Sequence, residues 1–193
     1  MVEMTVAGLA LDASNRSPIV LLRDPSGHRQ VPIWIDHSQA HNIVAGLKQS
    51  HTDFPLTHDL IVSLLKAGNL LLDRVIIHEV TGNTFQAVLK LSFKPVAGEQ
   101  TDDKATTQFE IEARPSDAIA LAVRTKCSIW MLEKVVAEAS IPVNEEADEE
   151  DQDEFRRFLN DVSPADLIRH LKENDQNNEP PFDRPNSDSK NQR

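Results

Sequence analysis

The sequence predicts an α+β domain in which mixed or antiparallel sheets surround two central helices. Segments with alternating apolar and polar residues, typical of half-buried strands, lie before and after segments with helical spacing. Residues 118–123 contain no polar side chain, and a helix that is apolar on all sides is a buried one. Turn chemistry such as Asp24-Pro25-Ser26-Gly27 separates the strand segments. These three observations together define the fold class.

The first predicted strands are residues 4–11, 18–23 and 30–35. The apolar positions of the first strand change parity at Gly8, which indicates a bulge. Pro32 lies inside the third strand but has no backbone N–H to donate. It therefore indicates either the edge of a sheet or another bulge.

Two helices are expected after the third strand. Asp36 is expected to cap the first, residues 37–48, and Thr57 to cap the second, which ends at Gly68-Asn69. The second helix is expected to bury one side, which consists of Leu60, Ile61, Leu64 and Leu65.

Residues 75–93 predict a hairpin, and residues 107–113 predict a central strand that leads into the buried helix. Pro115 disfavours helical geometry at Arg114, so the strand should end there. Ser116 or Asp117 can then cap the helix. A short strand at 128–131 and a short helix at 133–139 complete the predicted domain.

An internal echo connects two of these corners. Residues 34–40 and 112–118 both run from a strand through a polar corner with Ser-x-Ala into a helix. A duplicated β-α-β-β unit would explain the echo, and chance similarity is the open alternative.

The chain divides into four predicted parts: a domain at 1–143, an acidic linker at 144–154, a short helical pair at 155–173 and a disordered tail at 174–193. The linker has eight acids within residues 145–154, and such runs repel themselves and stay solvated. The helical pair either docks on its own domain or, as residues 155–172, binds a protein partner.

Composition limits the setting of the protein. No run approaches the roughly 18 apolar residues of a membrane span, and the N-terminus does not read as a signal peptide. Cys127 is the single cysteine, which fits a reducing, cytoplasmic location and a small core residue better than a nucleophile. The net charge of −11 lies mostly beyond residue 143, and no basic stripe announces a nucleic-acid substrate.

The candidates for phosphodiester chemistry lie at two helix starts. Cleavage needs an activated water and cations facing the developing charge, and helix N-termini offer N–H groups to a phosphate. Arg114 can clamp a phosphate, and His58 or Asp59 can act as base or ligand. The alternative is structural, since Asp59, Ser116 and Asp117 are capping types and Arg114 can pair with Asp117. The candidate set is His58, Asp59, Arg114, Ser116 and Asp117.

Two further pairs that include histidine are candidates for metal binding. His37 and His41 have the i, i+4 spacing of a helical metal site but lack the glutamate of HExxH, so packing explains them as well. His78 and Glu79 form a second pair, which the polarity of a strand surface explains equally.

Several stretches of the chain, taken together in order, resemble the bifunctional nuclease family (BFN domain). The resemblance covers residues 3 to 140 and implies a compact, oligomeric α+β domain with nuclease activity on DNA and RNA. The matching stretches are Leu9-Ala10-Leu11-Asp12 with Pro18-Ile19-Val20-Leu21, Val31-Pro32-Ile33-Trp34-Ile35, Pro55-Leu56-Thr57-His58-Asp59-Leu60, and Arg114-Pro115-Ser116-Asp117-Ala118-Ile119-Ala120-Leu121-Ala122.

Two functions follow as hypotheses. One is a nuclease of low sequence preference on DNA or RNA, in which His58, Asp59, Arg114 and Asp117 converge and a divalent ion, Mg²⁺ or Mn²⁺, assists. The other is a non-catalytic oligomeric interaction domain, favoured by Gln39 standing where the family usually has glutamate. Either is expected to be a homodimer, since short strands leave edges that must be covered.

Overall fold

The computed structural model describes residues 1–49, 54–82, 84–94 and 108–143, with the helical positions Asp153, Phe155 and Arg157. The compact unit that carries the sheet ends at Phe155, whose side chain is buried. Apart from those three positions, the predicted acidic linker, helical pair and tail (144–154, 155–173 and 174–193) lie outside the described residues. The predictions made for them therefore stay predictions.

The described residues form one eight-stranded mixed sheet, in the order β6-β5-β4-β7-β1-β2-β3-β8, with helices packed on it. Neighbouring strands run antiparallel except β4 and β7, which are parallel. The α+β prediction is confirmed. In chain order the elements are β1 (Val2–Leu11), β2 (Pro18–Arg23), β3 (Arg29–Trp34), α1 (His37–Leu47), α2 (Thr57–Ala67), β4 (Leu70–Thr81), β5 (Thr84–Phe93), β6 (Gln108–Ala113), α3 (Pro115–Thr125), β7 (Ser128–Met131), α4 (Glu133–Ala139) and β8 (Ile141–Pro142).

The sheet consists of two three-stranded meanders that meet at β7. One meander is β1–β2–β3 and leads through a corner to α1, and the other is β4–β5–β6 and leads through a corner to α3. The echo in the sequence therefore marks equivalent corners. The unit that recurs in the structure is a meander followed by a helix, rather than β-α-β-β.

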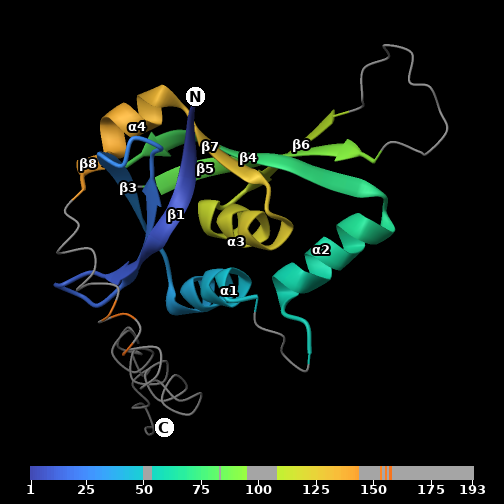
Figure 1. The fold of residues 1–193 in the computed structure, drawn as a ribbon, viewed down its shortest axis with the longest axis horizontal. Coiled ribbons are helices and arrows are strands. Elements are labelled where there is room, and N and C mark those ends of the chain that lie inside the picture. The colour runs from blue at the N-terminus through green and yellow to red at the C-terminus, as the bar shows by residue number, and fades with distance from the viewer. Residues whose placement is uncertain are drawn as a thin grey trace, which may run out of the picture. The chain divides into compact units, whose positions relative to one another are not determined.

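Helix α3 is the centre of the core. Figure 1 shows it inside the curve of the sheet with α1 beneath it, and α3 contacts α1, β4, β5 and β7. From Ala118 to Ala122 no side chain is more than 3% exposed. The small residues of this run let the helix lie close to its neighbours, so the prediction of a buried central helix is confirmed.

The first meander forms as the sequence indicated. The pairing of β1 with β2 shifts register between Val6 and Gly8, which is the predicted bulge. The edge strand β8 pairs with β3 only at Arg29 and Gln30, so Pro32 pairs with β2 on one side and lies beyond β8 on the other. Asp36 caps α1 as expected, and its side chain accepts a hydrogen bond from the backbone N–H of Gln39.

Helix α2 differs from its prediction. Leu60 and Leu64 are 52% and 61% exposed, whereas the buried residue of this helix is His58. Its N-cap is Leu56 rather than Thr57, and no side chain caps it. The helical spacing of the apolar residues is confirmed, but only part of the predicted side packs. Helix α2 contacts α3 and β4, Ile61 and Leu65 are half-buried, and Leu60 and Leu64 are exposed.

The strand before α3 and the cap of α3 also differ. Strand β6 is the last strand of the sheet rather than a central one, and its Phe109 and Ile111 are 37% and 50% exposed. The N-cap of α3 is Arg114, with Pro115 in the first turn and no side-chain cap bond. Neither Ser116 nor Asp117 caps the helix, because the Asp117 carboxylate is bound to other side chains.

Candidate active site

The starts of α2 and α3 meet through one carboxylate. Asp117 Oδ1 lies 3.2 Å from His58 Nε2, and Asp117 Oδ2 accepts a hydrogen bond of 2.7 Å from Arg114 Nε. Asp117 therefore joins a residue of α2 to the N-cap of its own helix. Three of the predicted site residues come together here.

The three side chains differ in access to solvent. Arg114 is 69% exposed, Asp117 30% and His58 8%. The Asp117 carboxylate raises the pKa of the Arg114 guanidinium, so this cation is permanent. A ligand from solvent would meet Arg114 first, then the exposed part of Asp117.

His58 is placed to hold Asp117 rather than to touch a substrate. Its Nε2 faces Asp117, while its Nδ1 is buried and has no hydrogen-bond partner among the described residues. A general base must reach the proton that it removes. His58 therefore connects α2 to the start of α3 through Asp117.

Asp36 at the start of α1 belongs to the same neighbourhood. Burial acts to raise its pKa, but hydrogen bonds from Ser38 and Gln39 outweigh that effect, the Arg114 charge adds to them, and the net pKa is lowered. The charges of Asp36 and Asp117, from the starts of α1 and α3, thus both act on Arg114. The echo between the corners after β3 and β6 was the sequence signal that could have placed Asp36 here.

Asp59, the neighbour of His58, is not part of this cluster. Its Oδ1 accepts a hydrogen bond of 2.7 Å from Arg124 Nε, and its Oδ2 accepts the backbone N–H of Leu56 at 3.0 Å. Burial acts to raise the pKa of Asp59, but these bonds outweigh it and the net pKa is lowered. Ser116 is also withdrawn, since it is only 5% exposed in the first turn of α3.

Gln39, which stands where the resembled family usually has glutamate, has a structural role. Its side-chain oxygen accepts the backbone N–H of Asp36 at 3.0 Å, while Asp36 accepts the N–H of Gln39 at 2.8 Å. This reciprocal pair is a capping box, which glutamine completes as well as glutamate. Gln39 therefore preserves the corner that carries Asp36.

A complete protein cage for a metal is absent from the described residues, where no three His, Cys, Asp or Glu side chains cluster. The pairs His37–His41 and His78–Glu79 gain no third ligand there. His78 instead faces Glu112, with 3.8 Å between Nε2 and Oε2. A divalent ion would have to bind through few protein oxygens.

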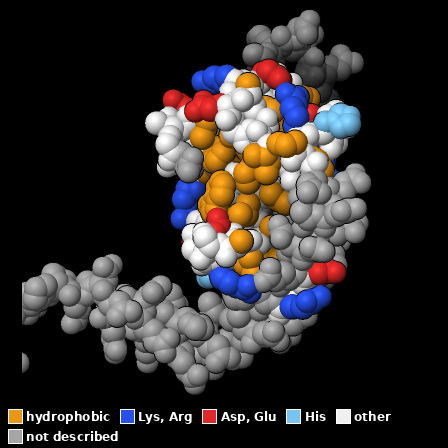
Figure 2. All heavy atoms as spheres, turned by 90° about the vertical axis from the view of Figure 1, so that its left-hand side faces the viewer, with side chains coloured by type: hydrophobic (Ala, Val, Ile, Leu, Met, Phe, Trp, Pro, Cys, Tyr) orange, Lys and Arg blue, Asp and Glu red, His pale blue; other side chains and the backbone are white. Residues whose placement is uncertain are grey.

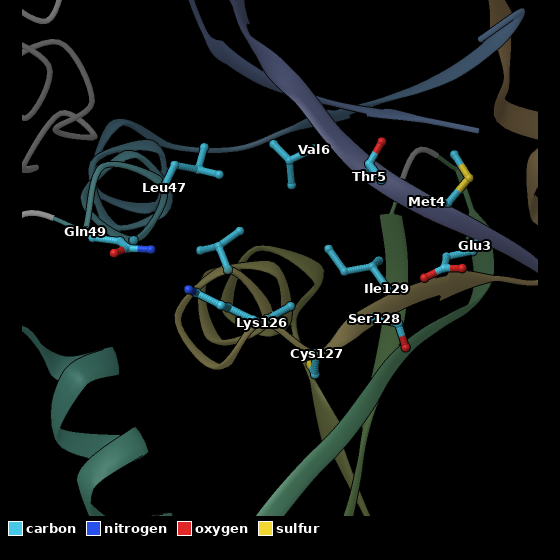
Figure 3. A pocket seen from close by; sticks show the side chains of 13 residues that line it. Glu3, Met4, Thr5, Val6, Leu47, Gln49, Lys126, Cys127, Ser128 and Ile129 are labelled. Atoms are coloured by element: carbon cyan, nitrogen blue, oxygen red, sulfur yellow. The ribbon is translucent and has the colours of Figure 1, made fainter. Parts of the chain in front are cut away.

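A pocket of about 380 Å³ lies at the other end of α1 and α3. Figure 3 shows Gln49 and Lys126 on one side of it and Met4, Cys127 and Ile129 on the other. Burial raises the pKa of the Cys127 thiol, which agrees with a packing role. None of the five predicted site residues lines this pocket. A second hollow, of about 480 Å³, is lined by Asp59, Arg124 and two lysines.

The protein is an α+β domain in which a mixed sheet curves around a buried helix. Arginine, aspartate and histidine side chains meet at the starts of two of its helices. No helix in the described part of the chain has the length and hydrophobicity to cross a membrane.

Comparison with known proteins identifies the family. A family model described as the bifunctional nuclease domain matches residues 20–144. Two curated relatives, each 33% identical over 175 residues, cover 86% of this chain and 98% of their own length. They are Uncharacterized protein MT1877 and Uncharacterized protein Rv1829, from Mycobacterium tuberculosis strains CDC 1551 / Oshkosh and ATCC 25618 / H37Rv. The chain belongs to the bifunctional nuclease domain family.

Proposed function

We propose that the protein is a nuclease that cleaves phosphodiester bonds of DNA or RNA at the cluster of Arg114, Asp117 and His58. The observation that carries the proposal is the bridged carboxylate of Asp117, which holds an exposed arginine at one oxygen and a buried histidine at the other. Family membership supplies the reaction class.

Each side chain has a distinct task in this proposal. Arg114 binds the phosphate and neutralises the charge that develops on it in the transition state. The start of α3 adds backbone N–H groups that favour the same anion. Asp117 orients Arg114 and, through its exposed edge, can accept a proton from the attacking water. His58 keeps Asp117 in place.

A divalent ion fits this site only when the substrate is bound and its phosphate oxygens complete the set of ligands. Mg²⁺ is commonly held by one or two carboxylates plus phosphate oxygens rather than by a cage of protein ligands. Asp117, and Asp36 whose charge acts on Arg114, would supply those carboxylates. Such an ion would supply Lewis-acid activation of the phosphate or the water.

The test is cleavage of labelled single-stranded and duplex substrates with and without chelator, for the parent and for Arg114→Ala and Asp117→Asn. Removing one transition-state donor is expected to lower kcat roughly 10²–10³-fold. Asp59→Ala is the matched control, because Asp59 lies outside the cluster and should change stability more than cleavage. Melting temperatures separate loss of chemistry from loss of fold.

Equal cleavage by the folded Arg114 and Asp117 variants and the parent would place the activity elsewhere. A parent that cleaves nothing with Mg²⁺ or Mn²⁺ would favour the second candidate, a non-catalytic interaction domain. One observation supports that candidate: both oxygens of Asp117 are engaged by protein groups, as a purely structural carboxylate would be.

Self-association is a separate proposal. Strand β6 leaves an open edge with Phe109 and Ile111 exposed, and α2 exposes Leu60 and Leu64. Covering such apolar surface and strand edges is a common reason for a homodimer. Light scattering of the full chain should show twice 21.6 kDa at micromolar concentration, and a monomer would contradict the proposal.

A further inference from the structure

Trp34 is an exposed aromatic residue whose orientation is fixed. Its side chain belongs to a residue that is 47% exposed, yet its indole Nε1 donates a hydrogen bond of 3.0 Å to Asp12 Oδ2. Asp12 is held in turn, because its other oxygen accepts hydrogen bonds from Ser14 and from the backbone N–H of Asn15. The ring is therefore pinned at its edge while much of its surface stays open.

The ring lies on the outer face of the first meander. Trp34 pairs with Ile19, and Ile19 with Ala10, so these side chains share one face. Pro32 and Leu21 form the next row on that face, while Val20 and Ile33 point into the core on the other. Figure 2 shows a continuous apolar surface on the side of the molecule that carries β3. The residues that flank Trp34 on this face are thus apolar: Ala10 and Leu21 are buried, and Ile19 and Pro32 are half-buried.

The position of Trp34 links this face to the candidate active site. Trp34 is the last residue of β3, and Asp36, two positions on, is the cap of α1 that lies within electrostatic reach of Arg114. The Cα atoms of residues two apart are within about 7 Å of each other. Trp34 is therefore two residues from a carboxylate on which the charge of Arg114, the proposed phosphate-binding cation, acts.

We propose that Trp34 is a base-stacking platform and that the substrate is accordingly single-stranded nucleic acid, with a base on the indole and the phosphate at Arg114. The proposal rests on the proposed function and specifies its substrate. Proteins that hold single strands combine cationic groups along the backbone with aromatic rings under the bases. A paired base inside a duplex is already stacked on both sides and cannot use the platform.

The chain provides its own reporter. It has two tryptophans, and Trp130 is half-buried with its Nε1 on Ser128 Oγ at 2.9 Å. In full-length Trp130→Phe, all tryptophan fluorescence therefore comes from Trp34. A short thymidine oligonucleotide, added with chelator so that metal-dependent cleavage is blocked, should quench this fluorescence to saturation. A duplex of the same length should bind roughly tenfold more weakly or less.

Substitutions then test the ring itself. In the wild-type background, with binding measured by a labelled strand, Trp34→Leu should lose roughly tenfold in affinity and Trp34→Phe should keep most of it. Phe54→Leu is the matched control, because Phe54 is 82% exposed but lies before α2 rather than on the sheet. Unchanged melting temperatures would show that the effects come from binding.

The outcomes separate this proposal from the nuclease proposal. Quenching by single strands without cleavage under any metal supports the platform and defeats the nuclease. Cleavage that is indifferent to Trp34→Leu, or equal affinity for duplex and single strand, overturns the platform and leaves the nuclease standing. A Trp34→Leu variant that changes oligomeric mass but not oligonucleotide affinity also overturns it, since the face would then be a contact between protein chains.

Discussion

Two neighbouring residues of α2 make opposite kinds of contact with α3. His58 meets Asp117 at the start of α3, where the third member, Arg114, is 69% exposed. Asp59 meets Arg124 at the end of α3, where the arginine side chain is 7% exposed. Arg124 also donates to the carbonyls of Asn42 and Ala120, at 2.7 and 3.0 Å. The buried arginine donates to acceptors on three helices and holds them together, whereas the exposed one has donors open to a ligand from solvent.

Arg124→Met should give the largest effect on stability. It removes the three hydrogen bonds that the guanidinium donates to the Asp59 carboxylate and to the carbonyls of Asn42 and Ala120. Losing hydrogen bonds to a charged group is expected to cost roughly 1.5–3 kcal/mol. Urea denaturation measures the loss, and a loss below that of Arg114→Met would contradict the comparison.

Gly46→Ala should give the next largest loss of stability. An added Cβ would meet Val123 Cγ2 at 2.6 Å and Arg124 Nη1 at 2.7 Å. Overpacking of this kind costs about 1–3 kcal/mol, and the helical preference of alanine returns about 0.5–1 kcal/mol. A net loss of stability is expected by thermal unfolding. Gly68→Ala is the control, because its Cβ would meet only ordinary contacts of 3.4 Å and longer.

Arg114→Met should hardly affect stability while it removes cleavage. Its ion pair with Asp117 is exposed, and exposed pairs contribute about 0–1 kcal/mol. Parallel urea titrations and cleavage assays compare it with Arg124→Met. If the exposed arginine were the more stabilising of the two, the division of labour between the two ends of α3 would be wrong.

The smallest expected effect is on the pH dependence of stability. The folded pKa of Asp59 is lowered from its usual 3.8, so the unfolded chain binds more protons in this range. The stabilisation from Asp59 is therefore fully present above the unfolded pKa and is lost as the pH falls through the lowered folded pKa. Melting temperatures measured from about pH 6 down to pH 3 should fall less steeply for Asp59→Asn than for the parent. Identical slopes would show that Arg124 does not depend on the charge of Asp59.

The elements that follow from local pattern were predictable from the sequence. The bulge at Gly8, the cap at Asp36 and the buried run before Val123 each depend on residues close in the chain. The starts of α2 and α3 came together as predicted for His58, Arg114 and Asp117.

What the sequence did not predict depends on partners distant in the chain. Helical spacing identified the apolar side of α2 but not whether that side faces the core. A buried apolar side and an exposed one have the same spacing along the helix. Asp59 lies outside the cluster because its carboxylate binds Arg124, which is 65 positions later in the chain. The alternation of residues 107–113 predicts a strand but not its number of neighbours, so it cannot distinguish a central strand from the edge strand that β6 is.

The position of β7 in the sheet affects how the protein can be made. Strand β1 pairs with β7 through Val2 and Met131, and β7 also joins β4, so nearly the whole domain lies between the two partners in sequence. During synthesis each meander can form as it leaves the ribosome. The two meanders cannot join into one sheet until residues 128–131, which form β7, have emerged. Non-local pairing of this kind slows folding, and the waiting edges of β1 and β4 are surfaces that favour aggregation until β7 arrives.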